Sequence, residues 1–306
     1  MENYERNLIE YSQFPRNQKV IFDSLDVNAH HIISNPDTVF AISISGGKDS
    51  QALLNAFMFF YCKMGLTNKV FAIHSDLGRF EWPQTLEHCK KLAEHWSIDL
   101  VVVRREREGK EMDLLDRIEQ RKTQLEGTGK PFWPSAMARY CTSDMKAEPI
   151  NKYLRQFKKV ISLEGIRWDE SKARSMKEVF TVRESLATKS REAYTWNAIA
   201  HFTEEDVWAT ETNMNSKALA NYREYYQKTG KVVKLFPFHP AYAMGNTRLS
   251  CAICILANKN DFHNGIKHNP TLAKQLAMME QESGFTFKQG QSITDVLNNN
   301  QTNLFQ

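Results

Sequence analysis

Short apolar runs alternate along the chain with longer stretches in which apolar residues recur every three or four positions. The short runs are typical of buried strands and span residues 38–44, 70–75, 99–103 and 160–165. The longer stretches predict amphipathic helices over residues 49–64, 82–96, 113–125 and 146–157. Strands that are joined by helical crossovers form parallel sheets with helices packed on both faces. We therefore predict an α/β fold built on a parallel sheet.

The pattern changes beyond Tyr194, where no further apolar run of strand type follows. The stretch "FTEEDVW" predicts a helix that begins after Thr203, because a threonine N-cap and acidic first-turn residues stabilise a helix start. A smaller region of short helices, loops and a polar tail is expected after it. The predicted organisation is a helical extension over 1–35, an α/β domain over 36–210 and a C-terminal helical region over 211–306.

The stretch "VFAISISGGKDSQALLNAF" places two glycines between a strand and a helix. Gly46 and Gly47 allow the main chain to turn so that several amide N–H groups and a positive helix end converge, an arrangement that suits phosphate. Lys48 adds a positive charge. A Walker A loop is excluded, because Ile42 and Asp49 stand where that motif requires glycine and serine or threonine. The alternative is a strand-to-helix turn capped by serines.

Residues 45–50, "SGGKDS", closely resemble the PP-loop of ATP pyrophosphatases. Four further stretches follow it in order: "RYCTSDMKAEPI", "GIRWDESKARS", "WNAIAHFTEEDVW" and "HPAYAMGNTRLSCAIC". With these, most of the chain is similar to the phosphoadenosine phosphosulfate reductase-like branch of PP-loop enzymes. The resemblance implies an adenine nucleotide alpha hydrolase-like fold and cleavage of ATP between its α and β phosphates.

The resemblance also implies roles for individual residues. ATP is expected to be bound by Ser43, Ser45, Gly46, Gly47, Lys48, Asp49, Ser50, Asp76, Gly165 and Arg167. Lys48, Asp49 and Arg167 are the candidate catalytic residues, with Asp49 positioning Mg²⁺. The candidate substrate-binding cations are Arg79, Arg139, Lys146, Arg174 and Arg248. A plain helix N-terminal role for Asp49 stays open, and at least one of the cations is expected to face solvent.

Five cysteines, an odd number, do not suggest a disulfide framework and favour a reducing, cytoplasmic location. Cys62 and Cys89 fall on apolar helical stripes and are predicted to be core thiols. Cys141, Cys251 and Cys254 are candidate metal ligands, because thiolates two residues apart can share a metal with a third. A [4Fe-4S] cluster, zinc with His239 or His263, and a packing motif without metal are the alternatives.

The C-terminal sequence helps to distinguish between the reactions that members of this branch catalyse. Its sulfonucleotide reductases use a cysteine in a C-terminal Glu-Cys-Gly segment, whereas this chain ends "QTNLFQ" with no cysteine after Cys254. The intact loop instead resembles the ATP pyrophosphatase of bacterial DNA phosphorothioation systems. That resemblance implies DNA as substrate and a cysteine desulfurase as sulfur donor. The alternatives are a sulfonucleotide reductase, a tRNA thiolation enzyme and a nucleotide-binding subunit without turnover.

Composition adds little to this picture. Apolar residues make up 42% of the 306 positions, charged residues 25%, and the net charge is +4, all ordinary for a globular protein. No apolar run approaches the roughly 20 residues that a membrane span needs, so no membrane partner is expected. Candidate nucleic-acid contacts are residues 104–110, Lys122, Lys130 and Trp133. Basic stretches of this kind are more often solvated helix faces.

Overall fold

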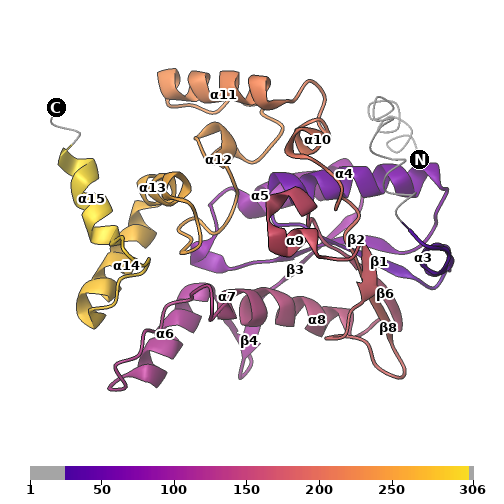
Figure 1. The fold of residues 1–306 in the computed structure, drawn as a ribbon, viewed down its shortest axis with the longest axis horizontal. Coiled ribbons are helices and arrows are strands. Elements are labelled where there is room, and N and C mark those ends of the chain that lie inside the picture. The colour runs from indigo at the N-terminus through magenta and orange to yellow at the C-terminus, as the bar shows by residue number, and fades with distance from the viewer. Residues whose placement is uncertain (1–24, 303–306) are drawn as a thin grey trace. The chain divides into compact units, whose positions relative to one another are not determined.

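The computed structural model describes residues 25–302, with side chains through residue 298 (Figure 1). Most of the predicted extension over 1–35 therefore lies outside the described residues. The described part of this extension contains the helix α3 (Val27–Ile33). The Asp26 side chain caps α3 by accepting from the Ala29 amide at 2.7 Å. No helix in the described part of the chain is both long and apolar enough to cross a membrane.

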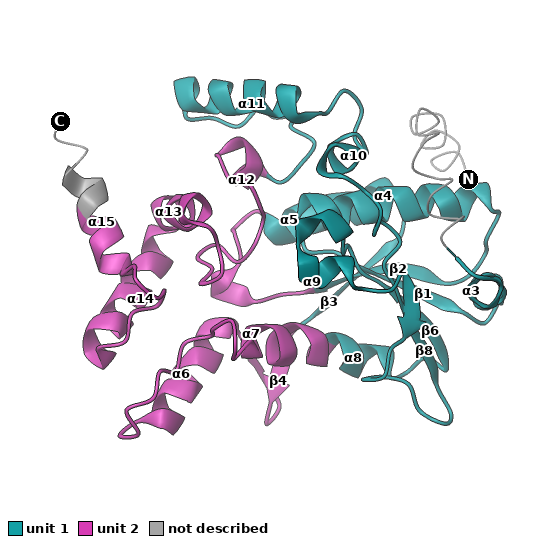
Figure 2. Cartoon of the chain, in the orientation of Figure 1, with its two compact units in different colours: residues 1–74, 85–103, 150–239 teal, residues 75–84, 104–149, 240–306 magenta. Residues whose placement is uncertain are grey.

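The chain divides into two compact units, each formed from segments that are separated in sequence (Figure 2). Unit 1 comprises residues 1–74, 85–103 and 150–239, and unit 2 comprises 75–84, 104–149 and 240–306. The ranges 36–210 and 211–306, which the sequence suggested as domains, each contribute to both units. The division therefore follows spatial packing and is not contiguous in sequence.

Unit 1 is built on a six-stranded sheet with the order β3-β2-β1-β6-β8-β7. The strands are β1 (Val39–Ser43), β2 (Val70–Ser75), β3 (Asp99–Val103), β6 (Lys159–Leu163), β7 (Phe180–Val182) and β8 (Glu192–Trp196). β1 pairs in parallel with β2 and β6, and β6 pairs in parallel with β8. The predicted parallel sheet is confirmed, with one difference: β7 is an antiparallel edge strand paired to β8.

Helices cover both faces of this sheet, as predicted. Phe40 and Ile42 of β1 join one buried cluster, whereas Ala41 between them joins another, because successive strand residues point to opposite faces. α4 (Lys48–Lys63) and α5 (Thr85–His95) contribute to the first cluster, and α8 (Glu148–Leu154) contributes Leu154 to the second. β1 is thus buried on both sides, and its carboxyl end is held in a fixed place.

Two predicted helices differ in extent from the observed ones. The helix expected over 82–96 begins at Thr85, because Trp82 packs in the core of unit 2. The helix expected over 146–157 is split into a π-helical turn, η2 (Ser143–Ala147), and α8. Cys89 is a core thiol as predicted, but Cys62 near the end of α4 is only half-buried, so that prediction was wrong.

The rest of unit 1 is helical. It holds η3 (Trp168–Glu170), α9 (Lys172–Ser175), α10 (Glu204–Trp208) and α11 (Ser216–Thr229). The predicted cap of α10 is confirmed: the Thr203 hydroxyl accepts from the Asp206 amide at 3.1 Å, and the Asp206 carboxylate accepts from the Thr203 amide at 2.8 Å. α10 therefore starts with a complete capping box and three acidic residues.

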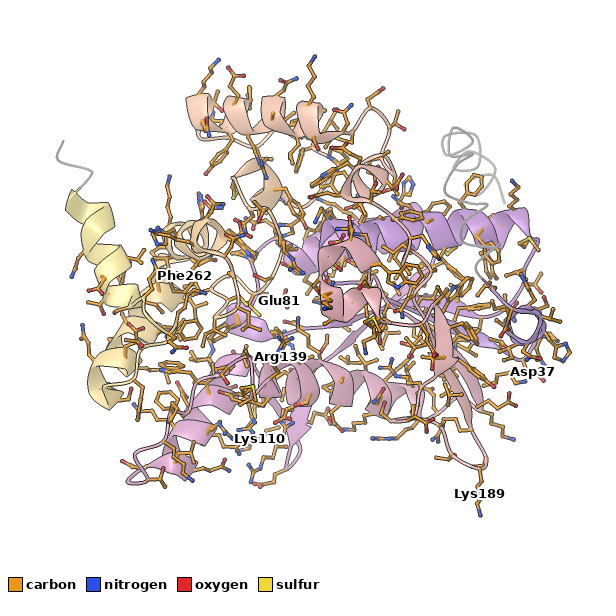
Figure 3. All side chains as sticks on the ribbon, in the orientation of Figure 1. Asp37, Glu81, Lys110, Arg139, Lys189 and Phe262 are labelled. Carbon is orange, nitrogen blue, oxygen red and sulfur yellow. The ribbon has the colours of Figure 1, made fainter. Side chains whose placement is uncertain are left out.

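Unit 2 combines a small hairpin with a helical core. Its elements are η1 (Gly78–Phe80), β4 (Arg105–Arg107), β5 (Lys110–Met112), α6 (Leu114–Leu125), α7 (Tyr140–Thr142), η2, α12 (Pro240–Ala243), α13 (Lys259–His268), α14 (Pro270–Ser283) and α15 (Ile293–Thr302). Large apolar side chains such as Phe80, Phe262 and Phe287 form its buried centre. The helical C-terminal region is thus confirmed. Figure 3 labels Phe262 on α13 among the side chains of this unit.

Candidate active site

The glycine turn after β1 leaves the start of α4 without a side-chain cap. Gly46 has a φ of +73°, a conformation that residues with a Cβ rarely adopt, and Gly47 is the N-cap residue. The Ser50 hydroxyl donates to the Gly47 carbonyl at 2.9 Å and accepts from the Ser45 amide at 3.1 Å, which closes the loop. Gly47 has no side chain to cap the helix, and among the described residues no side-chain cap hydrogen bond is made here, an arrangement that suits an anion.

Gly165 brings a second segment against this helix start. It follows β6, and a Cβ added there would lie 3.1 Å from the Asp49 carbonyl carbon and oxygen and 3.2 Å from the Ser50 amide nitrogen. Contacts this short force neighbouring backbone to move. The glycine thus permits the chain after β6 to touch the first turn of α4, and its role in binding a nucleotide stays a prediction.

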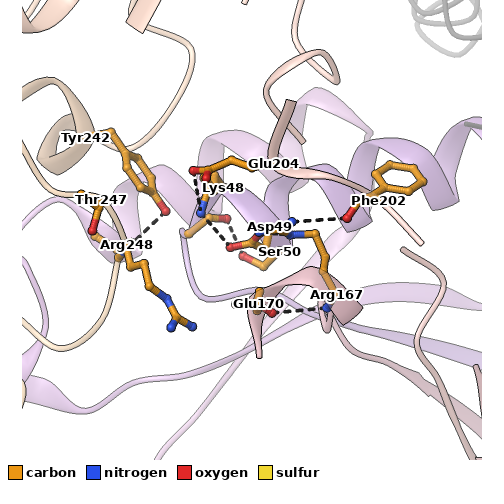
Figure 4. Close-up of polar contacts among 12 residues, drawn as sticks. Lys48, Asp49, Ser50, Arg167, Glu170, Phe202, Glu204, Tyr242, Thr247 and Arg248 are labelled. Carbon is orange, nitrogen blue, oxygen red and sulfur yellow. Dashed lines mark hydrogen bonds and ion pairs between the residues drawn. The ribbon is translucent and has the colours of Figure 1, made fainter. Parts of the chain in front are cut away.

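Lys48 is held in place by the carboxylates of Asp49 and Glu204, which Figure 4 shows, and by an indole ring. Its side chain is only 3% exposed, and its Nζ lies 3.3 Å from Asp49 Oδ2 and 3.7 Å from Glu204 Oε1. The same Nζ lies 5.8 Å from the centroid of the Trp208 ring. An ammonium group held in this way can exchange a carboxylate partner for a phosphate oxygen.

Arg167 ties the strand end after β6 to the start of α4. Its Nε donates to Asp49 Oδ1 at 2.6 Å, and its Nη1 donates to the Phe202 carbonyl at 3.3 Å and to the Asp169 carboxylate (Figure 4). Burial lowers the pKa of Arg167, but the charge and hydrogen bond of Asp49 outweigh it, so the net shift is upward. In this arrangement Arg167 positions Asp49.

Asp49 does not present a free carboxylate to Mg²⁺ in this arrangement. Its Oδ1 accepts from Arg167, and its Oδ2 pairs with Lys48. A divalent cation requires oxygen ligands that are not already neutralised. The residues as they lie therefore do not fit Mg²⁺ at Asp49, and the assignment of the metal to this side chain stays a prediction.

The remaining cations expected at the site have other partners. In unit 1, Arg174 pairs with Glu170. In unit 2, Arg79 pairs with Asp113, with 2.5 Å between Nε and Oδ2, and also with Asp116. Two acidic partners for one arginine favour a structural contact that fixes the start of α6. The substrate roles of Arg79 and Arg174 stay predictions.

Asp76, Arg139 and Arg248 all belong to unit 2. The Asp76 carboxylate accepts from Arg104 Nε at 3.0 Å and from the Gly78 amide at 2.7 Å, and so shapes the turn after β2. Arg139 is exposed at the start of α7, where Figure 3 labels it. The Arg248 amide donates to the Asp261 carboxylate at 3.1 Å. Among the described residues, none of these hydrogen bonds joins one of the three residues to another.

Unit 2 does bring together Cys141, Cys251, Cys254 and Lys146. The Cys251 thiol donates to the Cys254 sulfur; this hydrogen bond lowers the pKa of Cys254 to about 6 and raises that of Cys251 well above its usual value. Burial raises the pKa of Cys141. Burial lowers the pKa of Lys146, but the facing charges of Cys251 and Glu81 outweigh it and raise the pKa overall.

The arrangement of these thiols does not form a metal site. Within the described residues, no group of three or more histidine, cysteine, aspartate or glutamate side chains is arranged to hold a metal ion. His239 belongs to unit 1, with Nε2 3.4 Å from the Thr85 hydroxyl, and His263 contacts Gln291. The thiols as they lie do not fit a resident cluster or zinc ion, and that assignment stays a prediction.

The Cys-Ala-Ile-Cys loop is clamped from two sides. The Ala252 amide donates to the Phe80 carbonyl at 2.7 Å, and a Cβ on Gly265 of α13 would lie 1.9 Å from the Ala252 carbonyl oxygen. Only glycine permits that approach. Gly265, like Glu204 and Trp208, has a role that the sequence alone did not reveal, because its partner is distant in the chain.

The family comparison covers most of the chain. Residues 39–257 match the model of the phosphoadenosine phosphosulfate reductase domain, and the chain belongs to that family. An uncharacterized protein of Methanocaldococcus jannaschii is 27% identical over 197 residues, which is 59% of this chain and 37% of that protein. The chain therefore spans little more than a third of the length of this curated relative.

Three solved structures are similar to the chain at a low level. An FMN adenylyltransferase from Candida glabrata is 15% identical, covers 68% of this chain and 65% of its own, and has a TM-score of 0.42. A phosphoadenylyl-sulfate reductase from Candida auris is 16% identical, covers 72% and 92%, and has a TM-score of 0.40. A U34-tRNA thiolase from Methanococcus maripaludis is 13% identical, covers 74% of each chain and has a TM-score of 0.41. At these values the likenesses say nothing about the chemistry of this chain.

Proposed function

We propose that the chain is an ATP pyrophosphatase, which converts ATP to AMP and pyrophosphate, and that it activates a nucleic-acid oxygen for sulfur incorporation. The favoured acceptor is the DNA backbone, as in phosphorothioation. The observation that carries the proposal is the start of α4, where Gly46 and Gly47 leave first-turn amides uncapped beside the buried cation of Lys48. Family membership supports a nucleotide-directed reaction.

In the proposed reaction, the first-turn amides of α4 bind phosphate oxygens of ATP, and Lys48 exchanges Glu204 for one of them. The acceptor oxygen then forms a bond to the α-phosphorus as the bond to the bridging oxygen breaks. Pyrophosphate leaves with the electron pair of that bond, and the developing negative charge is stabilised by the amides and Lys48. Arg167 acts by fixing the position of Asp49 and of the helix start through its hydrogen bond to the Asp49 carboxylate. Mg²⁺, when bound, would neutralise further charge on the phosphates.

The sulfur step is proposed for the cysteines of unit 2. A cysteine desulfurase would deliver sulfur as a persulfide on one of Cys141, Cys251 and Cys254. The terminal sulfur attacks the activated acceptor, and AMP leaves. A second thiol then attacks the sulfur–sulfur bond, which releases the thiolated product and leaves a protein disulfide. An external dithiol reductant restores the two thiols. The hydrogen bond between Cys251 and Cys254 supports such a pair.

Two other reactions share the family. A tRNA thiolation enzyme would use the same loop with an RNA acceptor, and a sulfonucleotide reductase would use a cysteine thiol to attack the sulfur of its substrate. Neither is better supported by the geometry than the proposed function.

The first test measures the products of ATP turnover by the full chain. We expect pyrophosphate and AMP in equal amounts, and we expect Lys48→Ala to lower the turnover number by about 10²-fold or more, because a charge-stabilising donor is lost. Lys63→Ala is the matched control, since Lys63 is an exposed lysine in the last turn of the same helix. Orthophosphate and ADP as first products, or equal loss in both variants, would contradict the proposal.

A further inference from the structure

Three arginines in unit 2 gather around one carboxylate and one aromatic ring. Arg105 comes from β4, Arg117 and Arg121 come from α6, Tyr140 opens α7, and Asp144 lies in the π-helical turn η2. All five residues belong to segment 104–149 of one unit (Figure 2). π-helical turns are uncommon and occur often at functional sites. The proposed ATP reaction uses none of these residues.

Asp144 neutralises only part of this positive charge. Its Oδ2 accepts from Arg117 Nε at 3.1 Å and lies 3.0 Å from Arg117 Nη2, whereas Arg105 Nη1 is 3.9 Å from the same oxygen. Arg105 Nη1 also donates to the Asp144 carbonyl at 3.2 Å. Arg121 forms no ion pair within the described residues. Three positive charges thus face a single carboxylate.

Tyr140 provides a rigid surface for two of the guanidinium groups. Arg117 and Arg121 lie over its ring, with centroid distances of 4.8 Å and 5.1 Å. The Tyr140 hydroxyl donates to the Phe132 carbonyl at 2.7 Å, which fixes the ring. Burial raises the pKa of Tyr140 well above its usual value, so the ring carries no charge that could balance the arginines.

Each arginine also has a donor without an acceptor. Arg105 Nε, Arg117 Nη1 and Arg121 Nε are buried and have no hydrogen-bond partner among the described residues. Folded proteins leave few buried polar groups unpaired, and each one calls for an explanation. Three such donors on three neighbouring cations are explained by an anion that the protein binds.

Unit 2 also has a hollow, although none of the five cluster residues lines it. It has a volume of about 480 Å³ and is lined by residues of β4, β5 and α6: Arg107, Glu108, Lys110, Glu111, Met112, Asp116 and Gln120. The Arg105 and Asp144 side chains are 22% and 26% exposed, so the cluster is open to solvent.

The acidic residues that line the hollow already have cationic partners. Glu111 pairs with Arg104 at 2.9 Å, Glu108 pairs with Arg107 at 3.3 Å, and Asp116 pairs with Arg79. Arg104 also pairs with Asp76, and Arg79 also pairs with Asp113, so Glu111 and Asp116 are neutralised only in part. Figure 3 labels Lys110, a further cation at the start of β5 in this unit.

We propose that Arg105, Arg117 and Arg121 form a binding site for a phosphate-type oxyanion, with Tyr140 as its rigid floor. Planar guanidinium groups match the oxygens of such an anion through paired N–H donors. The anion is either a backbone phosphate of a nucleic acid or free inorganic phosphate. The site lies within unit 2 and does not depend on whether the chain cleaves ATP.

The test uses the full chain without ATP and two variants, Arg105→Gln and Arg121→Gln. Arg107→Gln is the matched control, because Arg107 is exposed, lies on the same strand and, among the described residues, forms its ion pair with its neighbour Glu108 and not with Asp144. Binding of a fluorescein-labelled single-stranded DNA of about 15 nucleotides is measured between about 50 and 200 mM KCl. Melting temperatures are measured with and without inorganic phosphate.

If the anion is a nucleic-acid phosphate, each variant weakens DNA binding about tenfold and lowers the salt slope by about 0.7, whereas Arg107→Gln does not. If it is free phosphate, DNA binding is unchanged, but both variants lose part of the phosphate-dependent rise in melting temperature. Either result supports an oxyanion site. The proposal is overturned if both variants match Arg107→Gln in DNA binding and in the phosphate-dependent rise in melting temperature. It is also overturned if both variants melt at a lower temperature but show no change in either of these two quantities.

Discussion

At the scale of single residues, Lys48 is the centre of the proposed reaction, and its surroundings describe a nucleotide-free state. Its ammonium group is buried between Asp49 and Glu204 and lies over Trp208. Asp49 is also fixed by Arg167, whereas the Glu204 side chain is 55% exposed and opens the first turn of α10. Of the two carboxylates, Glu204 is the one that a triphosphate can displace.

Replacing Glu204 by glutamine removes the competitor of the phosphate for Lys48. Exposed ion pairs contribute at most about 1 kcal/mol, so we expect the dissociation constant of ATP to fall about two- to fivefold. The turnover number should stay unchanged, because Glu204 does not touch the reacting atoms. Titration of ATP by calorimetry, together with initial rates of pyrophosphate release, separates the two effects.

Glu205→Gln is the control for that experiment. Glu205 is the next residue on α10, and its carboxylate accepts from the Ser216 amide and hydroxyl, away from Lys48. We expect its variant to bind ATP as the parent does. Weaker ATP binding by Glu204→Gln would show instead that this carboxylate assists nucleotide binding, and the account of Lys48 would then be wrong.

At the scale of elements, a buried polar network joins α4 to its neighbours in unit 1. The Gln51 side chain donates to Glu211 at 2.6 Å and to the Pro237 carbonyl at 2.9 Å, and its oxygen lies 2.9 Å from His88 Nε2 on α5. The His88 and His239 rings meet edge to face, 5.7 Å apart. The network lies one turn beyond Lys48 and holds the start of α4 in place.

These two histidines make the stability of unit 1 sensitive to acid. Burial, with Lys91 adding to it, lowers the pKa of His88 to about 4, and burial, with His88 adding to it, lowers the pKa of His239 to about 3. An unfolded histidine has a pKa near 6.5, so the unfolded chain binds more protons below that pH. Stability is therefore complete above pH about 6.5 and falls below it, by about 1.4 kcal/mol per pH unit for each histidine.

Denaturant unfolding followed by fluorescence between pH about 6.5 and 4.5 measures this loss. We expect His88→Gln to reduce the pH slope, while His31→Gln, a substitution of an exposed histidine on α3, leaves it unchanged. A slope that is the same in all three proteins would mean that the buried histidines are not the cause.

At the scale of the whole molecule, the local pattern of apolar and polar residues predicted the fold class. The same pattern could not predict the contacts between distant segments that complete the sites. The strands at 70–75 and 99–103 were predicted with their observed bounds, because short apolar runs are read locally. β8 was missed because its five residues begin with Glu192 and its burial depends on pairing with β6 and β7.

The candidate site shows the same limit. The glycine turn and Lys48 follow from a strand–turn–helix pattern, which the sequence displays. The pairing of Lys48 with Glu204 and the contact of Gly265 with Ala252 depend on how distant segments pack. The buried arginine donors around Tyr140 were invisible too, since the sequence gives Arg105 only as part of a charged run.

The most direct test of the central claim is a crystal structure of the full chain with a non-hydrolysable ATP analogue. We expect phosphate oxygens within about 2.7–3.2 Å of the first-turn amides of α4 and of Lys48 Nζ, with Nζ moved away from Glu204. A triphosphate bound elsewhere, with Lys48 still paired to Glu204, would contradict the account.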